Sequence, residues 1–313
     1  MKRMLPIHMD RRSDVPSLDW LDFTGERLVG PFFDDDVLRV GRSRPVIRTP
    51  LDDLHTMGQA LPADEIAGFI FHMSRCGSTL LARMLAQLPE TIVLSEPQPI
   101  LVALPLPGTA RRCLPLLHGL LRAYAQRSAG TGSRLIVKFG ARDAAALGFV
   151  RANWPRVPVA LVIRDPIEVM VSNLREPAPW LRAAAHPLMA AATTGLPPEE
   201  FHDVDRETFL ARSLGLFCEQ ALANREAPFV AVDYTALPWR GFHAVADLFG
   251  LAVDARARAA IVDLVGWHAK SPNRPFEPDA ARKRSAATPA MIAAVERWAL
   301  PAYRPLASIA VRG

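Results

Sequence analysis

The chain has 313 residues, half of them hydrophobic, and a formal net charge of +5. This length accommodates one large α/β domain or two small ones with a sizeable core. No basic block is interleaved with aromatic residues, which argues against a nucleic-acid-binding surface. No apolar span approaches the roughly 18 residues that a transmembrane helix needs.

Three cysteines, Cys76, Cys113 and Cys218, are widely separated and odd in number. Because no C-x-x-C pair or Cys/His cluster accompanies them, the sequence predicts neither a disulfide framework nor a metal site. Residues 1–16 lack the apolar region of a secretory signal. These features together predict a reducing, cytoplasmic location.

Residues 1–62 differ from the rest and are predicted to form an N-terminal extension with short β elements. Residues 18–23 alternate between apolar and polar side chains, and residues 37–40 are a second candidate strand. The acidic run 34–36 is expected to be a solvated turn rather than a set of metal ligands. Residues 63–313 then form the main domain.

The main domain opens with a strand, a tight loop and a helix. Residues 69–73 form an apolar run, 74–79 form a small polar loop, and apolar residues recur at helical spacing from 80 to 88. Gly77 allows the backbone to turn closely, and Arg75 adds a planar, permanently charged donor. Unpaired N–H groups at the start of a helix bind phosphate or sulfate, so this loop is a candidate anion site.

Further strands are predicted at residues 91–95, 135–139, 157–163 and 229–234. The continuous apolar run 157–163 is typical of a buried parallel strand. Strands that alternate with helices indicate an α/β fold with a parallel central sheet flanked by helices and right-handed crossovers. Helices are predicted at 109–127, 142–153, from 166, 205–225, 241–250, 254–266 and from 288, where Thr288 and Pro289 form a cap.

Three segments carry no regular pattern. Residues 97–107 are apolar and rich in proline, and residues 268–287 are polar and basic. Residues 176–203 hold several prolines around an alanine-rich, helical piece, a composition found in lids and substrate-binding loops.

The loop at 74–79 does not meet the Walker A pattern, because no lysine precedes Ser78 and no glycine stands at 71–73. It resembles instead the nucleotide-binding loop of the sulfotransferase family, in which a basic residue, a small residue, glycine and two hydroxyl residues follow the first strand. The matching residues here are Arg75, Cys76, Gly77, Ser78 and Thr79. The resemblance implies a P-loop-like sulfotransferase fold, with Cys76 making backbone contacts only.

A second match lies at Arg164 and Ser172. Sulfotransferases carry an arginine at the end of a central strand and a serine eight positions later, and both bind the 3′-phosphate of 3′-phosphoadenosine 5′-phosphosulfate (PAPS). Arg164 ends the predicted strand 157–163, at the edge where open α/β sheets bind ligands. A guanidinium fork suits a phosphate dianion.

Two weaker matches concern residues that follow later in the chain. Tyr234 resembles the tyrosine of a strand-end motif of the family and either contacts the nucleotide or is a core residue with a satisfied hydroxyl. Residues 271–284 resemble the loop that closes over the nucleotide in tyrosylprotein sulfotransferases. Ser271, Pro278 and Lys283 fit that loop loosely, and Arg282 and Arg284 are alternatives to Lys283.

The resemblance also suggests the catalytic groups. Cytosolic sulfotransferases end a strand with Lys-x-His, but here Lys138 is followed by Phe139 and Gly140, which takes no proton. The protein-tyrosine and heparan types instead place a glutamate after the first helix, and Glu96 stands there. Glu96 is therefore expected to be the general base, with Lys138 and Arg75 neutralising the leaving group. The alternative bases are His186 and His268, whereas His72 is expected to pack inside the first strand.

The resemblance implies direct transfer of a sulfuryl group from PAPS to a hydroxyl or amine acceptor, releasing adenosine 3′,5′-bisphosphate without a metal ion. The acceptor, a small molecule or a polymer, and the oligomeric state are left open. One alternative is a P-loop kinase or NTPase, which needs a Walker lysine and a magnesium-binding carboxylate, for which Asp165 is the candidate. Another is a non-catalytic module that binds an anionic ligand.

Overall fold

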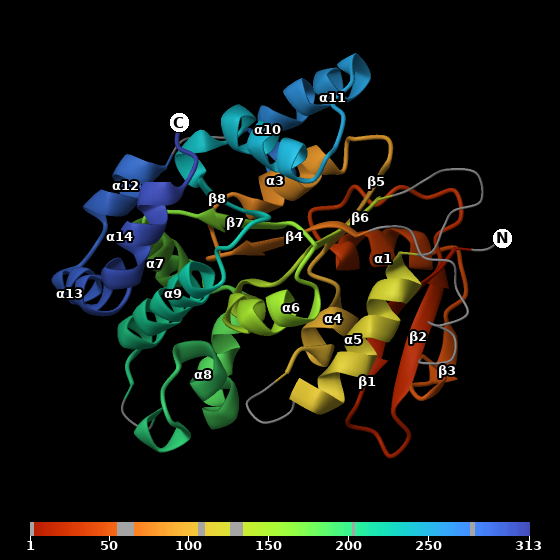
Figure 1. Cartoon of the computed structure of the whole chain (residues 1–313), viewed down its shortest axis with the longest axis horizontal. Coiled ribbons are helices and arrows are strands. Elements are labelled where there is room, and N and C mark those ends of the chain that lie inside the picture. The colour runs from red at the N-terminus through yellow and green to blue at the C-terminus, as the bar shows by residue number, and fades with distance from the viewer. Residues whose placement is uncertain (1–2, 55–65, 106–109, 126–133, 202–203, 276–278) are drawn as a thin grey trace.

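The computed structural model describes residues 3–54, 66–105, 110–125, 134–201, 204–275 and 279–313. Its centre is a five-stranded parallel sheet in the order β5-β6-β4-β7-β8 (Figure 1). The predicted α/β fold with a parallel central sheet is therefore confirmed. The strands are β4 (Ile66–His72), β5 (Thr91–Ser95), β6 (Arg134–Lys138), β7 (Val159–Ile163) and β8 (Phe229–Asp233).

Helices cover both faces of this sheet (Figure 1). One face packs on α3 (Ser78–Leu85), α10 (Trp239–Leu248) and α11 (Ala255–Val265). The other packs on α4 (Gln98–Ala103), α5 (Ala110–Tyr124), α6 (Leu147–Asn153) and α9 (Arg206–Ala223). Because both faces are covered, the central strands are almost wholly buried, as the continuous apolar runs predicted.

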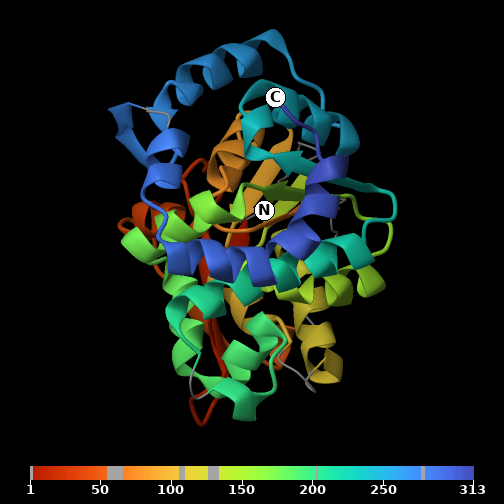
Figure 2. The same cartoon turned by 90° about the vertical axis from the view of Figure 1, so that its left-hand side faces the viewer.

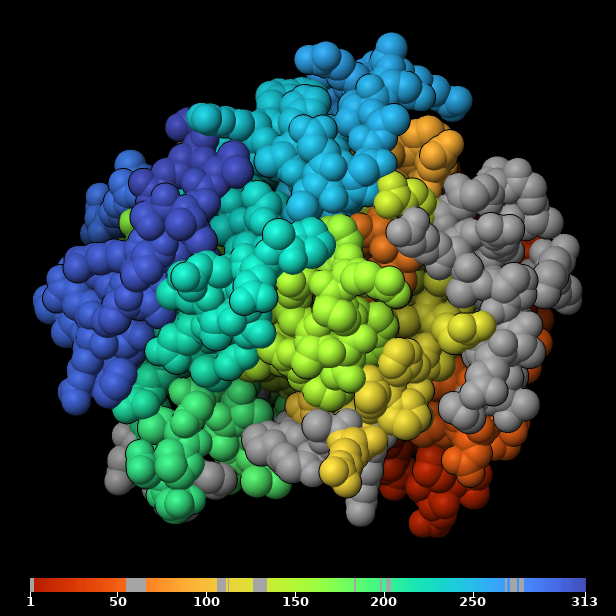
Figure 3. Space-filling model, in the orientation of Figure 1, coloured from red at the N-terminus to blue at the C-terminus, as the bar shows by residue number. Residues whose placement is uncertain are grey.

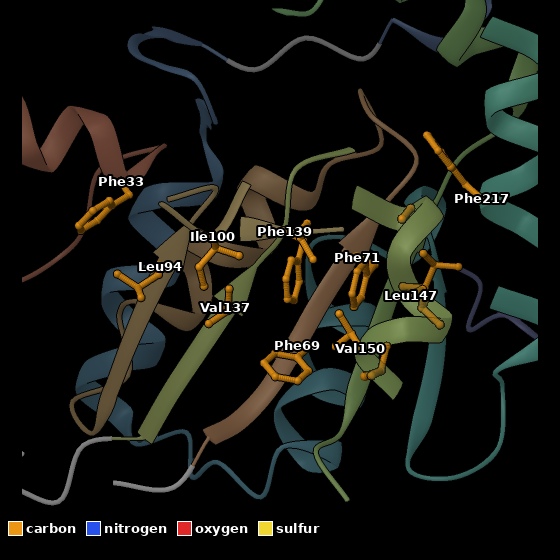
Figure 4. Close-up of a cluster of buried hydrophobic side chains, with 14 of the residues drawn as sticks. Phe33, Phe69, Phe71, Leu94, Ile100, Val137, Phe139, Leu147, Val150 and Phe217 are labelled. Carbon is orange, nitrogen blue, oxygen red and sulfur yellow. The ribbon is translucent and has the colours of Figure 1, made fainter. Parts of the chain in front are cut away.

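Aromatic side chains fill the core on the second face (Figure 4). Phe69 and Phe71 of β4 point to the same side, where the ring of Phe71 stacks on Phe139 with centroids 4.4 Å apart. Ile70, one residue along, belongs to the core of the opposite face. This alternation is the period of two that a strand imposes.

The N-terminal region forms a small antiparallel sheet in the order β1-β2-β3, which confirms the β-containing extension. Its strands are β1 (Met4–Asp10), β2 (Ser17–Asp22) and β3 (Ile47–Pro50). The region shares one continuous hydrophobic core with the main domain. Across the junction, the hydroxyl of Tyr124 in α5 donates to the Pro6 carbonyl at 2.7 Å.

Two expectations for this region are wrong. Residues 37–40 are not a strand but part of the helix α1 (Phe33–Gly41), which buries Phe33 and Val40 on one side. The acidic run 34–36 is not a solvated turn but the first turn of that helix, where carboxylates meet the positive end of the dipole. Asp36 is 3 % exposed and pairs with Arg39 at 3.0 Å.

The segments without a regular pattern also contain structure. Residues 97–107 include α4, and the predicted helix 142–153 divides into the 3₁₀ helix η1 (Ala141–Ala146) and α6. Residues 268–287 are not a polar loop but carry most of a β-hairpin and a short helix. These elements are β9 (Trp267–His268), β10 (Ser271–Pro275) and α12 (Ala280–Ser285).

The C-terminal helices α13 (Pro289–Trp298) and α14 (Leu300–Ile309) lie along α9 (Figure 2). The Thr288 hydroxyl caps α13 by accepting the Met291 N–H at 3.3 Å, as the sequence predicted. In the view of Figure 3 the N-terminal strands and the C-terminal helices occupy opposite sides of the molecule. The remaining elements are α7 (Pro166–Arg175), η2 (Pro179–Ala185), α8 (Pro187–Thr194), η3 (Pro198–Phe201) and η4 (Tyr234–Ala236).

None of the helices within the described ranges combines the length and the apolar character that crossing a bilayer requires.

Candidate active site

The predicted site residues gather at the carboxyl ends of the five parallel strands. Glu96 follows β5, Lys138 ends β6, Arg164 follows β7 and Tyr234 follows β8. Glu96, Arg164 and Tyr234 line a cavity of about 1360 Å³, in the place where open α/β sheets bind ligands, whereas the predicted Lys138 is fully buried behind Glu96 and is not part of the lining. The predicted residues that line it are Arg75, Cys76, Gly77, Ser78, Thr79, Glu96, Arg164, Ser172, Tyr234, Arg282, Lys283 and Arg284.

Some predicted residues fall elsewhere. His186 is exposed at the start of α8 and is not among the residues that line the cavity. Pro278 lies outside the described residues, and the side chains of Ser271 and His268 are not described either.

The loop between β4 and α3 has an unusual backbone. Ser74 (φ 69°), Arg75 (φ 50°) and Gly77 (φ 84°) all have positive φ, which is uncommon for residues with a side chain and concentrates at functional sites. A Cβ on Gly77 would lie 2.8 Å from Leu237 and 2.9 Å from the Tyr234 ring. Both the dihedral angle and the space therefore require glycine at position 77.

The loop ends at Gly77, and the first turn of α3 follows directly. Ser78 and Thr79 are buried there, beside the unpaired N–H groups of the helix. Cys76 is also buried, its Sγ lies 3.2 Å from the Val162 carbonyl, and burial raises the pKa of its thiol. A buried thiol with a raised pKa is a poor nucleophile, so the chemistry of this loop lies in its backbone donors and hydroxyls.

The arginine predicted to bind phosphate meets this loop directly. Arg164 donates from Nη1 to the Arg75 carbonyl at 3.2 Å, and its guanidinium lies 4.0 Å from the centre of the Tyr234 ring. Its other donors hold carboxylates, with Nε 2.7 Å from Glu168 and Nη2 2.8 Å from Asp279. The two stretches that resemble sulfotransferase motifs therefore form one wall of the cavity.

The basic residues of α12 join the same cluster. Lys283 pairs with Asp279 at 2.9 Å, and burial lowers the pKa of the Lys283 ammonium. Arg284 lies 2.9 Å from Glu168 and 3.5 Å from Asp165. Lys283 is thus held by the cap residue of α12. Arg284 is held by Glu168 of α7 and by Asp165, the cap residue of α7.

Glu96 and Lys138 form an ion pair at the ends of β5 and β6. The Lys138 ammonium is fully buried and contacts Glu96 Oε1. Burial on its own raises the pKa of the Glu96 carboxyl, but Lys138 and then His72 outweigh it and hold that pKa below its usual value. Glu96 is therefore ionised, and its positive φ of 58° marks a second constrained backbone position in the site.

His72 takes part in this arrangement, which the sequence did not indicate. The ring is buried at the end of β4, as predicted, but its Nε2 lies 3.3 Å from Glu96 Oε1. Its Nδ1 accepts the Ser74 N–H at 3.1 Å, so the neutral ring carries its proton on Nε2, facing Glu96. Burial, and then the Lys138 charge, lower the pKa of His72 to about 4.

Another carboxyl that lines the cavity, Asp143, was not predicted. It is 4 % exposed, and burial raises its pKa from 3.8 to about 7 in spite of the nearby Arg142 charge. Asp143 Oδ2 accepts the Gly140 N–H at 2.8 Å and would lie 3.1 Å from a Cβ at position 140. The Asp143 carboxyl thus fills the space that a side chain at position 140 would occupy. An acidic residue five positions beyond the end of β6 was the only available signal.

The N-terminal extension forms part of the cavity wall, which the sequence analysis did not predict. Phe32 and Asp34 line the cavity, and the Phe32 ring lies 5.6 Å from the Lys138 ammonium and 5.5 Å from that of Lys270. Burial, and then the charges of Arg75 and Lys138, lower the pKa of Lys270. Periodicity in a single sequence gives no means of placing Phe32 beside lysines so far along the chain.

The segment predicted to be a lid or substrate-binding loop also reaches the cavity. Its residues Ala178, Pro179 and Trp180 form part of the lining. The Trp180 indole donates to the Ser74 hydroxyl at 3.2 Å, which fixes η2 to the β4–α3 loop.

No protein-family model and no curated protein matches this sequence. Several solved structures resemble it, and three of them are compared below. Sulfotransferase STF9 from Mycobacterium avium is 12 % identical with a TM-score of 0.49, over 83 % of this chain and 80 % of that one. Sulfotransferase STF1 from Mycobacterium tuberculosis H37Rv is 14 % identical with a TM-score of 0.44, over 80 % and 78 %. The sulfotransferase domain from the curacin biosynthetic pathway is 17 % identical with a TM-score of 0.40, over 71 % and 87 %. All three are sulfotransferases, but with TM-scores below 0.5 the functional assignment depends on the residues of the cavity.

Proposed function

We propose that this protein is a sulfotransferase that moves a sulfuryl group from PAPS to a hydroxyl or amine acceptor. The observation that supports this most directly is the contact between Arg164 and the Arg75 carbonyl, which joins residues 89 positions apart in the chain. The guanidinium that we propose binds phosphate therefore contacts the loop that we propose binds an anion, and both line one cavity with Glu96.

The residues fit a ligand that carries two separate anionic groups. The N–H groups at the start of α3, with Ser78 and Thr79, suit the 5′-phosphosulfate. Arg164 and Ser172 suit the 3′-phosphate. Arg164 already holds two carboxylates within the chain, so its environment supports charge-assisted bonds to anionic oxygens.

In the proposed reaction, the acceptor oxygen or nitrogen forms a bond to sulfur while the bond from sulfur to the bridging phosphate oxygen breaks. Adenosine 3′,5′-bisphosphate leaves with that electron pair, and Glu96 takes the acceptor proton. Lys138 and Arg75 offset the charge that develops on the bridging oxygen. The rest of the rate enhancement comes from holding the two substrates in line.

The ion pair between Glu96 and Lys138 makes the basicity of Glu96 depend on whether the donor is bound. While Lys138 contacts Glu96, the low pKa of the carboxylate makes it a weak base. When the ammonium turns toward a bound donor, the pKa of Glu96 rises because burial is the largest influence that remains. Glu96 then becomes a stronger base only in the donor complex.

Calorimetric titration of adenosine 3′,5′-bisphosphate, compared with ATP and magnesium, tests the proposal. We expect the bisphosphate to bind more tightly. Tighter binding of ATP would favour a kinase or NTPase instead, and bisphosphate binding without transfer to any acceptor would favour a non-catalytic module.

A matched pair of variants sharpens the test. Ser172→Ala should weaken bisphosphate binding by about tenfold, the value of one hydrogen bond to a charged group. Ser308→Ala, which removes a hydroxyl on the exposed side of α14, should leave it unchanged. Equal affinities for the two variants would remove Ser172 from the phosphate site.

A further inference from the structure

One carboxylate occupies the place where the proposed 3′-phosphate would bind. Asp279, the cap residue of α12, lines the cavity, and each of its two carboxylate oxygens contacts a basic side chain. Its Oδ1 lies 2.8 Å from Arg164 Nη2, and its Oδ2 lies 2.9 Å from Lys283 Nζ. Two cations that suit a phosphate are therefore already bridged by a side chain of the protein.

The second carboxylate on Arg164 has a different position. Glu168 contacts Arg164 Nε at 2.7 Å and its side chain is 3 % exposed, so it supports the guanidinium from within the fold. The Asp279 side chain is 27 % exposed. Separating a buried carboxylate from its cation costs much free energy, because it leaves an unpaired charge inside the protein. A more exposed carboxylate can leave its cation at little cost, because water solvates it. Of the two, Asp279 is the one that a ligand can displace.

Asp279 is also charged when a ligand arrives. Burial tends to raise the pKa of its carboxyl, but Lys283 and Arg164 outweigh this and lower it. No hydrogen bond from the Asp279 side chain caps α12, so its contacts within the described residues are directed to the two cations. Its carboxylate thus imitates an anionic ligand rather than stabilising the helix start.

We propose that Asp279 is an internal competitor for the phosphate site, which weakens the binding of nucleotide and so promotes release of the bisphosphate product. This inference rests on the proposed function, because that function supplies a product which keeps its 3′-phosphate. A ligand group that enters between Arg164 and Lys283 must displace the carboxylate. A ligand without such a group leaves Asp279 in place.

The competitor predicts a selective effect of Asp279→Asn. The affinity for adenosine 3′,5′-bisphosphate should rise about tenfold, while that for adenosine 5′-phosphate should change by less than about twofold. Turnover under saturating substrates should fall if product release limits it. Asp279→Glu, which keeps the charge, should stay near the wild-type affinity. Asp263→Asn, an exposed aspartate on α11, is the control for net charge.

Calorimetry of these four proteins decides the matter. A loss of bisphosphate affinity in Asp279→Asn would mean that Asp279 only orients Arg164, and an equal gain for both nucleotides would mean a general charge effect. Either result, or no change, overturns the proposal. Titration with pyrophosphate separates it from the proposed function. A gain for pyrophosphate with no preference for the bisphosphate over ATP would keep the competitor and reject the sulfotransferase.

Discussion

The raised pKa of Asp143 leads to a quantitative prediction. The folded protein holds this proton up to about pH 7, whereas the unfolded chain releases it near 3.8. A difference of about 3 pH units corresponds to about 4 kcal/mol. Because the folded state binds more protons in this window, the contribution of Asp143 to the free energy of unfolding should fall as pH rises from about 4 to 7 and level off above.

His72 acts in the opposite direction over nearly the same range. Its pKa falls from 6.5 to about 4 on folding, so the unfolded chain binds the extra proton and stability rises with pH. The two groups largely cancel, and the wild-type profile alone does not separate them. The informative quantity is the difference between wild type and Asp143→Asn, in which an amide oxygen still accepts the Gly140 N–H.

Denaturant unfolding at several pH values measures this difference. Relative to wild type, the stability of Asp143→Asn should rise by about 2 kcal/mol between pH 5 and pH 7 and by only about 0.4 kcal/mol between pH 7 and pH 8.5. Asp263→Asn should show no such trend. A stability difference between wild type and Asp143→Asn that stays constant from pH 5 to 8.5 would refute the assignment of a neutral carboxyl in the cavity.

Three further predictions concern the proposed reaction. Glu96→Gln should slow single-turnover transfer by a factor of about 10² to 10⁴ yet keep bisphosphate binding, and a parallel loss of binding would argue against a base. Arg164→Ala should weaken bisphosphate binding tenfold or more and lower stability by about 3 kcal/mol, because it removes one partner of the buried Glu168. Adding Glu168→Gln should restore stability on denaturant unfolding but not binding on calorimetry. Gly77→Ala should lower stability by about 1–2 kcal/mol through its positive φ alone and also disrupt bisphosphate binding; unchanged affinity would remove the loop from the site.

Much of the architecture followed from local patterns. Continuous apolar runs predicted the central strands, and the helical spacing after them predicted a parallel sheet. Once the strands are parallel, their carboxyl ends share one edge, so residues such as Glu96, Lys138 and Arg164 had to lie near one another. Proximity at this level needs no side-chain detail.

The errors have a common physical origin. Val37 and Val40 suit a strand, but their spacing of three also suits one face of a helix, and packing against the main domain selects the helix. Residues 268–287 look polar and irregular in the sequence, and the helix α12 within them has no buried residue. In both cases tertiary contacts outweigh local preference.

From the sequence alone came the order of strand, loop and helix, the glycine at 77, and the residues that end the central strands, because these depend on neighbours within a few positions. The partners of those residues were decided by the tertiary structure. Asp279 on Arg164, His72 on Glu96 and Phe32 beside Lys138 all join distant parts of the chain. Such pairs depend on how side chains fill the space between packed elements. Periodicity along the chain depends only on near neighbours and therefore does not predict these contacts.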